Sequence, residues 1–408
     1  MATTSPLRDR HERAEASFLP WGTPENAVEV VETYGEVALE YAAIRRGCGL
    51  IDLPARAVVE ITGADRVDFL NRMLTAPMAD LAPMQARRSF WLNRKGRIDA
   101  DMRLIELGDR MLVDVDCHAA ERLVSTLTDF VFTEEVEIRD RSSELHRFGL
   151  HGPTGPFLLE ACAELVEGEK PSALQPGSGC VLRVAGHRVV VERDDLTGTC
   201  GLHLTMPIGG VEEVFETLVR TGHTEHGAVR AERELAGEEA GGFRLRPIGW
   251  AAFNVARIEA GTPLYYIDYG PDSLPHETGV VDDRVSFTKG CYLGQEVVAR
   301  MHSRGGVKQR LVALRFPSLG AIPPGDPGPQ PETGSAILPA GAAPDAKPVG
   351  AVTSSTISPM LGGELIALAM VRSAHTAPGT KLLVQAIGET GETMLEAVVQ
   401  AQLKFLQQ

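Results

Sequence analysis

Two hydrophobic periodicities alternate along the chain, and together they predict a mixture of helices and strands. Apolar side chains spaced three to four residues apart predict helices at 25–47, 66–75, 119–132, 155–168, 211–222 and 250–261. Alternation or short apolar runs predict strands at 57–62, 89–93, 97–107, 110–116, 146–152 and, as a hairpin turning at Ala185 and Gly186, 180–194. Because these elements follow no regular βαβ repeat, the pattern favours an α+β fold over a doubly wound sheet. Thr62 and Asp65 precede the helix predicted at 66–75 with the spacing of a helix cap.

The pattern changes after Arg310. Residues 316–350 are rich in Pro, Gly and Ala and predict one long, mobile loop. Short strand-like runs separated by turn residues surround it, at 310–316, 349–356, 364–371, 380–387 and 396–403. They predict a small C-terminal β-barrel or sandwich. We therefore expect four segments, namely a mobile tail at 1–24, mixed α/β lobes at 25–135 and 136–306, and the β module at 307–408.

The composition is that of an ordinary globular protein with an acidic surface. Of 408 residues, 43% are hydrophobic and 5% aromatic, and 55 acidic residues against 40 basic ones give a net charge of −15. This balance argues against nucleic acid as the main ligand. The longest apolar run, 365–371, is too short to span a membrane, and the start of the chain has no hydrophobic signal segment. We expect a cytoplasmic protein without a membrane partner.

The cysteines and histidines match no metal-ligand spacing. Six cysteines are scattered without a CxxC pair, which suits a reducing compartment. Eleven histidines form no HExxH motif. We therefore expect no metal site.

The densest group of reactive and charged residues runs from Lys289 to Glu296, with the sequence KGCYLGQE. Between Arg284 and Arg310 there are six basic residues and one acidic residue, which is a local excess of +5. Such a patch would attract an anionic small ligand, and the alternative is a solvated surface with internal salt bridges.

Cys291 is the candidate nucleophile of this group. Lys289 lies two residues away, and a nearby ammonium favours the thiolate form of cysteine. Gly290 and Gly294 flank the cysteine and permit positive φ or a close approach to a ligand. The alternative is a small buried side chain, which is the usual state of an isolated cysteine.

A second candidate is the carboxylate face of the strand predicted at 97–107. Alternation places Asp99, Asp101 and Arg103 on one side of it. A carboxylate there could hold a cationic amine or accept a proton. The alternative is a strand surface that faces water.

The segment FTKGCYLGQEVVAR, residues 287–300, closely resembles the signature of the YgfZ-type folate-binding proteins, relatives of the glycine-cleavage aminomethyltransferase (T-protein). The runs 34–53, 62–75, 92–104 and 257–290 resemble the folate-binding lobes of this superfamily, and 349–371 is similar to its C-terminal barrel. The resemblance covers roughly residues 30–408.

The resemblance implies two folate-binding lobes and a small β-barrel around a central cavity that holds tetrahydrofolate or a one-carbon derivative. Asp101 falls where the transferases carry the acidic residue beside the reactive nitrogens of folate. The expected catalytic residues are Cys291, Lys289 and Asp101. The expected cofactor-binding residues are Asp101, Tyr292, Gly294, Gln295, Glu296 and Arg300.

One departure from the superfamily weighs against transferase chemistry. The transferases carry a glutamate that grips the pterin, and Thr199 stands at that position here. The resemblance implies a folate-dependent factor for the assembly or repair of iron–sulfur proteins, with those proteins or their assembly machinery as partners. The alternatives are a tetrahydrofolate-dependent aminomethyl- or methyltransferase and a folate-binding scaffold in which Cys291 is structural.

Overall fold

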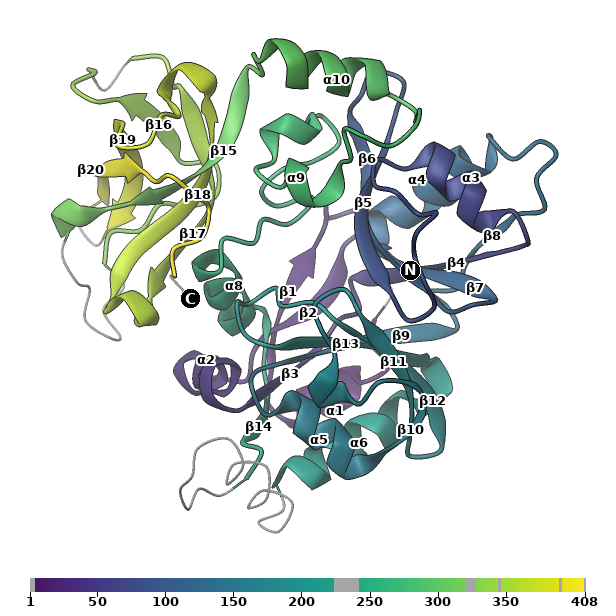
Figure 1. The fold of residues 1–408 in the computed structure, drawn as a ribbon. Coiled ribbons are helices and arrows are strands. Elements are labelled where there is room, and N and C mark those ends of the chain that lie inside the picture. Colours follow the sequence, from purple (N-terminus) through teal and green to yellow (C-terminus); the bar gives the residue numbers. More distant parts are fainter. Residues whose placement is uncertain (1–3, 224–241, 320–327, 344–345, 389–390, 407–408) are drawn as a thin grey trace. The chain divides into compact units, whose positions relative to one another are not determined.

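The computed structural model describes residues 4–223, 242–319, 328–343, 346–388 and 391–406 (Figure 1). The chain divides into two compact units, of which the first comprises residues 1–89 and 101–253 and the second residues 90–100 and 254–408. In the described ranges, no helix combines the length and the apolar character that crossing a bilayer requires.

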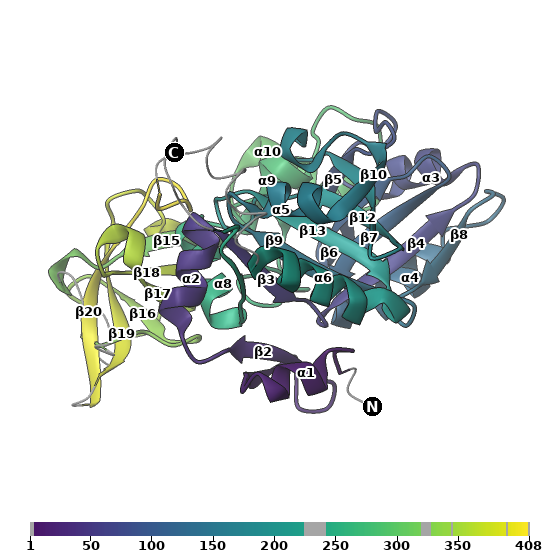
Figure 2. The same ribbon diagram turned by 90° about the horizontal axis from the view of Figure 1, so that it is seen from below.

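A seven-stranded sheet forms one layer of the first unit. Its strands, in spatial order, are β10 (Ala163–Gly168), β11 (Gly179–Val184), β12 (His187–Arg193), β13 (Gly201–Pro207), β9 (Leu145–His151), β3 (Cys48–Asp52) and β14 (Leu245–Pro247). Helices α5 (Gly155–Cys162) and α6 (Val211–His223) cover one face of it (Figure 2). The core between them contains Leu158 and Phe215 from the helices and alternate apolar residues of β11, β12 and β13.

A five-stranded sheet forms the second layer. Its order is β5 (Ala86–Leu92), β6 (Ile98–Glu106), β7 (Arg110–Asp116), β4 (Arg56–Thr62) and β8 (Glu137–Asp140). Helix α3 (Arg66–Met73) follows β4 along the chain, and helix α4 (Cys117–Thr128) packs on β4 and β7. The loop between β5 and β6 belongs to the second unit.

The two sheets face each other across an apolar cluster. Val58, Ile105 and Leu112 come from the five-stranded sheet, and Val181 and Val190 come from the seven-stranded one. All five side chains are buried. The alternate positions along β4, β6, β7 and β12 therefore line the space between the sheets.

The second unit contains a closed barrel of six antiparallel strands. Their order is β15 (Gln309–Arg315), β18 (Glu364–Arg372), β17 (Gly350–Ser358), β16 (Ala336–Pro339), β19 (Lys381–Gly388) and β20 (Gly391–Val399). Helices α9 (Val281–Arg284) and α10 (Gln295–Arg304) precede the barrel, and α8 (Trp250–Glu259) runs across the division between the units. Single 3₁₀ turns lie at Pro171–Ala173, Ile208–Gly210, Pro275–Glu277, Pro317–Leu319, Pro359–Leu361 and Ser373–His375. The predicted α+β class is thus confirmed, and the C-terminal module is a closed barrel.

Residues 4–24 do not form the mobile tail that we expected for 1–24. Residues 4–24 contain helix α1 (Arg8–Arg13) and strand β1 (Ser17–Trp21), which pairs with β2 (Val28–Thr33). The buried carboxylate of Asp52 accepts hydrogen bonds from the His11 and His146 rings at 2.9 and 2.6 Å. The segment is therefore tied to the sheet by buried polar contacts that no sequence periodicity indicates.

Other predicted elements also differ from the structure. The helix predicted at 25–47 is strand β2 followed by α2 (Val37–Arg46), because Gly35 at φ +97° breaks the run. The second half of the helix predicted at 155–168 is strand β10. Asp65 precedes α3 but does not cap it, since its carboxylate accepts from the backbone amide of Glu135 at 2.8 Å.

The loop predicted at 316–350 is interrupted by strand β16, which pairs with β17 and β19 in the barrel. Its residues 320–327 and 344–345 lie outside the described residues.

Candidate functional site

Asp101 lies on β6, whose residues are buried along its whole length. Asp101, Arg103 and Ile105 share the face of β6 that is turned toward the seven-stranded sheet. The Asp101 residue is only 8% exposed. The alternative of a strand surface facing water is therefore wrong.

The start of β6 is fixed by a tyrosine that the sequence analysis did not single out. Within the second unit, the buried Tyr265 hydroxyl lies 3.0 Å from the carbonyl oxygen of Ile98 and 3.1 Å from that of Asp99. The side-chain amide of Asn93 donates to the Asp99 carboxylate at 3.1 Å. These bonds hold the backbone two residues before Asp101. A signal was present, because three of the six tyrosines lie within residues 265–269.

Behind Asp101, a layer of ion pairs is buried between the two sheets of the first unit. Arg103 donates to Glu192 at 2.7 Å, and Arg147 donates to the other oxygen of Glu192 at 2.8 Å. Arg103 also lies 3.3 Å from Asp194, which Arg88 contacts as well. Glu192 thus pairs with two buried guanidinium groups, and Asp194 lies close enough to one of them to share in balancing their charge.

Asp114 on β7 extends this ionic layer. It accepts from Arg56 at 2.8 Å and lies 3.6 Å from Arg147. Burial alone would raise the pKa of Asp114, but the charges of Arg147 and Arg56 outweigh it and hold the pKa at about 2. The carboxylate is therefore ionised at neutral pH.

Two histidines, His151 and His203, are also buried in the first unit but form no ion pair among the described residues. The rings of His151 and His203 meet edge to face at 5.5 Å. Neither ring nitrogen of His151, nor Nε2 of His203, has a hydrogen-bond partner among the described residues. Burial, above all, lowers the pKa of each to about 3. Both rings are therefore neutral at pH 7.

The loop at 194–200 contains Thr199, at which the resemblance led us to expect a glutamate. Thr199 is half-buried, and its hydroxyl bonds to that of Thr197 at 3.0 Å. Arg45 donates to the backbone oxygen of Thr197 at 2.6 Å. The loop is therefore held in place, and Thr199 offers a hydroxyl there.

The octet 289–296 leads into α10 in the second unit. Gly294 has φ +80°, and a Cβ atom there would lie 2.8 Å from the backbone oxygen of Asn93. Gly290 has no such constraint. Of the two glycines expected to need a positive φ or a close approach, only Gly294 does.

The side chains of the octet differ in exposure. Cys291 is exposed rather than buried. Lys289 is half-buried, its ammonium lies 5.4 Å from the centre of the buried Tyr292 ring, and burial lowers its pKa to about 8. Gln295 begins α10 and its amide is 3.5 Å from the backbone oxygen of Gly290.

The basic patch is smaller than the sequence suggests. Arg284 is buried, pairs with Asp283 at 2.7 Å and lies over the Phe90 ring. The exposed Arg300 pairs with Glu296 at 2.7 Å. The patch thus has internal salt bridges, as the alternative interpretation held, and Lys308 and Arg310, which follow α10 along the chain, are exposed.

One group of neighbouring residues in the described part of the chain could ligate a metal ion. Ligand atoms of Asp116, Cys117 and His118 lie within 4.8 Å of one another. Asp116 accepts from the backbone amide of His118 and from the Trp21 indole, each at 2.9 Å. Asp116 is therefore the N-terminal cap of α4, and this role explains why the three side chains lie close together.

The chain belongs to the glycine cleavage T-protein family. The family's "GCVT N-terminal domain" matches residues 7–289, and its "Glycine cleavage T-protein C-terminal barrel domain" matches residues 320–402. A crystal structure of the glycine cleavage system aminomethyltransferase T from Bartonella henselae has the same fold, with a TM-score of 0.77 and 22% identity over 100% of this chain and 98% of that one.

Curated relatives span nearly the same length. The aminomethyltransferase of Streptomyces coelicolor is 28% identical over 85% of this chain and 84% of its own. That of Saccharopolyspora erythraea is 27% identical over 94% of both chains. The relatives named here are aminomethyltransferases, and none is named as an iron–sulfur factor.

Proposed function

We propose that this chain binds tetrahydrofolate and catalyses one-carbon transfer as an aminomethyltransferase. The names of its relatives favour this function over the iron–sulfur role that the octet suggests. The observation that carries it is the placement of Asp101, a buried carboxylate on a strand whose start is held by Tyr265.

Asp101 fits the acidic partner that a folate nitrogen would need. Its low exposure strengthens any hydrogen bond it accepts, because the local dielectric constant is low. Tetrahydrofolate, when bound, supplies the ring nitrogens that carry the one-carbon unit. Asp101 would accept a hydrogen bond from such a nitrogen, orient it, and stabilise positive charge that develops there.

The rest of the first unit supports this role. The ion pairs of Glu192 with Arg103 and Arg147 fix the face of β6 on which Asp101 lies. Thr199 would hold the pterin edge less firmly than a carboxylate, because one hydroxyl cannot make a bidentate, charge-assisted pair. We therefore expect weaker folate binding than a chain with glutamate there would show.

A turnover assay tests the proposal. The protein is mixed with tetrahydrofolate and a protein-bound aminomethyl donor, and formation of methylene-tetrahydrofolate is followed. We expect turnover, and we expect Asp101→Asn to reduce it by at least about 100-fold, within the range usual for a positioned acid–base group. An unchanged rate in Asp101→Asn would contradict the assigned role.

The octet favours a second candidate, the folate-dependent iron–sulfur factor. The observation behind it is the exposed thiol of Cys291 within a sequence that resembles the YgfZ signature. One thiolate cannot hold a cluster alone, so any cluster would be shared with a partner or in passage. Cys291→Ala should then fail to restore iron–sulfur enzyme activity in cells that lack the native factor, whereas Cys162→Ala should restore it. Full rescue by Cys291→Ala would remove this thiol from the function.

A further inference from the structure

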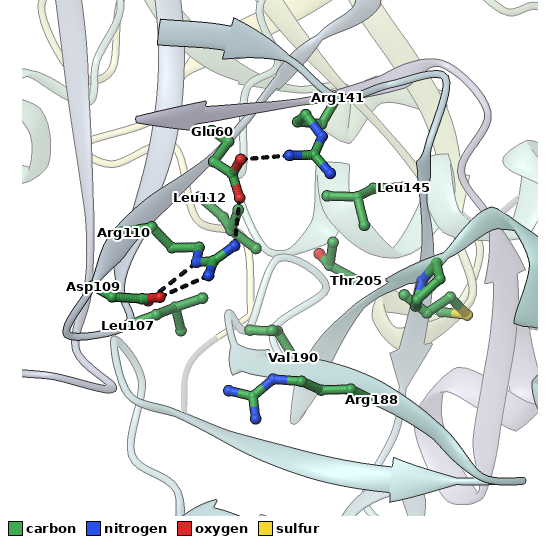
Figure 3. A pocket seen from close by; sticks show the side chains of 12 residues that line it. Glu60, Leu107, Asp109, Arg110, Leu112, Arg141, Leu145, Arg188, Val190 and Thr205 are labelled. Carbon is green, nitrogen blue, oxygen red and sulfur yellow. Dashed lines mark hydrogen bonds and ion pairs between the residues drawn. The ribbon is translucent and has the colours of Figure 1, made fainter. Parts of the chain in front are cut away.

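A hollow of about 430 Å³ opens at the edge of the two facing sheets in the first unit (Figure 3). Its floor is apolar and includes Leu107, Leu112 and Val190. Its polar groups are Glu60, Asp109, Thr205 and three arginines. This volume and this mixture of an apolar floor with a few polar groups are typical of small-molecule sites.

The hollow is separate from Asp101. Asp101 and Leu107 are six residues apart on the same side of the β6 chain, which corresponds to about 20 Å of extended strand. Between them lie the buried ion pair of Arg103 and the apolar side chain of Ile105. A molecule in this hollow would therefore not occupy the place of a folate at Asp101.

The acidic groups of the hollow are already neutralised. Glu60 accepts from Arg141 on one oxygen at 2.6 Å and from Arg110 on the other at 2.9 Å. Asp109 accepts from Arg110 with both oxygens, at 3.1 and 2.6 Å. Figure 3 shows Glu60 between these two arginines. A cationic ligand would have to displace one of these ion pairs.

Arg188 differs from the other two arginines. It lies on the far side of the hollow from Glu60, beside Val190 (Figure 3). Its one ion-pair contact among the described residues is with Glu167 at 3.6 Å, which exceeds hydrogen-bond distance. Its guanidinium therefore has donors to spare in a planar arrangement that matches a carboxylate.

We propose that this hollow binds a small organic monocarboxylate with an aliphatic or aromatic body. The carboxylate pairs with Arg188, and the apolar body lies on Val190, Leu112 and Leu107. The lining carries three arginines against two carboxylates, so its net charge favours an anion.

The test uses 4-phenylbutanoate and its uncharged counterpart 4-phenylbutan-1-ol as probes, with binding measured by calorimetry and by saturation-transfer NMR on the full chain. We expect the acid to bind at least about tenfold more tightly than the alcohol, which is the effect of one charge-assisted pair. Equal affinities for acid and alcohol would overturn the proposal, as would tighter binding of 4-phenylbutylamine.

Two substitutions locate the site. Arg188→Gln should weaken binding of the acid about tenfold, whereas Arg183→Gln should leave it within twofold. Arg183 is a matched control because it pairs with Arg188 in register, is equally exposed, and has the same long contact to a glutamate, but does not line the hollow.

Leu107→Glu adds a negative charge at the floor and should weaken binding of the acid more than that of the alcohol. Unchanged binding of the acid in both Arg188→Gln and Leu107→Glu would show that the hollow is not the site. Tetrahydrofolate binding should stay unchanged in every variant, which keeps this test independent of the proposed function.

Discussion

The conformation of Gly294 determines how the octet meets the start of α10. Its φ of +80° lies in the left-handed region, and the backbone oxygen of Asn93 fills the place that a side chain would need. The glycine two residues after the buried Tyr292 is therefore structural, whatever ligand the octet binds.

At this position a single methyl group should be costly. We expect Gly294→Ala to lower the free energy of unfolding by about 2 kcal/mol, from left-handed strain and the close contact with Asn93. Gly290→Ala is the matched control, since the added carbon meets nothing within 4 Å and φ is not positive. Urea unfolding of both variants checks this, and equal stability would show that the strain is relieved elsewhere.

Among the structural elements, β6 connects the fold with the proposed chemistry. Its face carries Asp101, then the ion pairs of Arg103, then the apolar Ile105. The ionic layer is the part of this interface whose disruption should cost most, because removing one partner leaves the other charges buried and unpaired.

We expect Glu192→Gln to destabilise the protein by about 3 kcal/mol, because Arg103 and Arg147 both lose their closest carboxylate in the interior. Each keeps only a longer carboxylate contact, Arg103 with Asp194 at 3.3 Å and Arg147 with Asp114 at 3.6 Å. Glu396→Gln removes a carboxylate from an exposed pair with Lys381 and should cost less than about 1 kcal/mol. Chemical denaturation measures both. Similar losses in the two variants would contradict the account of the ionic layer.

The sequence predicted elements well where one face is apolar, as in β4, β6, β7, the β11–β12 hairpin and the barrel strands β15, β17, β18 and β19. It missed β16, and it placed the last barrel strand at 396–403, whereas β20 spans Gly391–Val399. It failed where buried polar contacts or backbone geometry decide the structure. The ordered structure of residues 5–24 depends on a contact with Asp52, which is distant in sequence. Strand β10 continues directly from α5 and is an edge strand with mostly exposed side chains. No periodicity reports such features.

The candidate site was predictable to a similar extent. Alternation placed Asp101 and Arg103 on one face correctly. Their burial and the pairing of Arg103 with Glu192 depend on a second sheet some 90 residues away, which local patterns do not show. Tyr265 was missed although the tyrosines cluster at 265–269, because such a cluster does not show which hydroxyl bonds to the backbone of β6.

For the whole molecule, the buried histidines predict a pH dependence of stability. His151 and His203 have folded pKa values of about 3, below the unfolded value of about 6.5. The unfolded chain therefore binds their protons first, and stability is full above pH 6.5 and is lost as pH falls from there toward 3. Asp114, whose folded pKa is lowered to about 2, contributes a further loss only below about pH 4.

Between pH 7.5 and pH 5 we expect a loss of about 2 kcal/mol for each histidine. His151→Leu should remove the part of this loss that His151 contributes. Urea unfolding at the two pH values checks this. A profile that His151→Leu leaves unchanged would mean that His151 is protonated in the folded state.

The central claim is that a folate binds at Asp101, and calorimetric titration with tetrahydrofolate and its methylene and formyl forms tests it most directly. We predict saturable binding to the native chain, at least about tenfold weaker binding to Asp101→Asn, and unchanged binding to Asp109→Asn, which removes an exposed carboxylate of the distant hollow. Absence of binding to the native chain, or equal affinities of the two variants, would contradict the account.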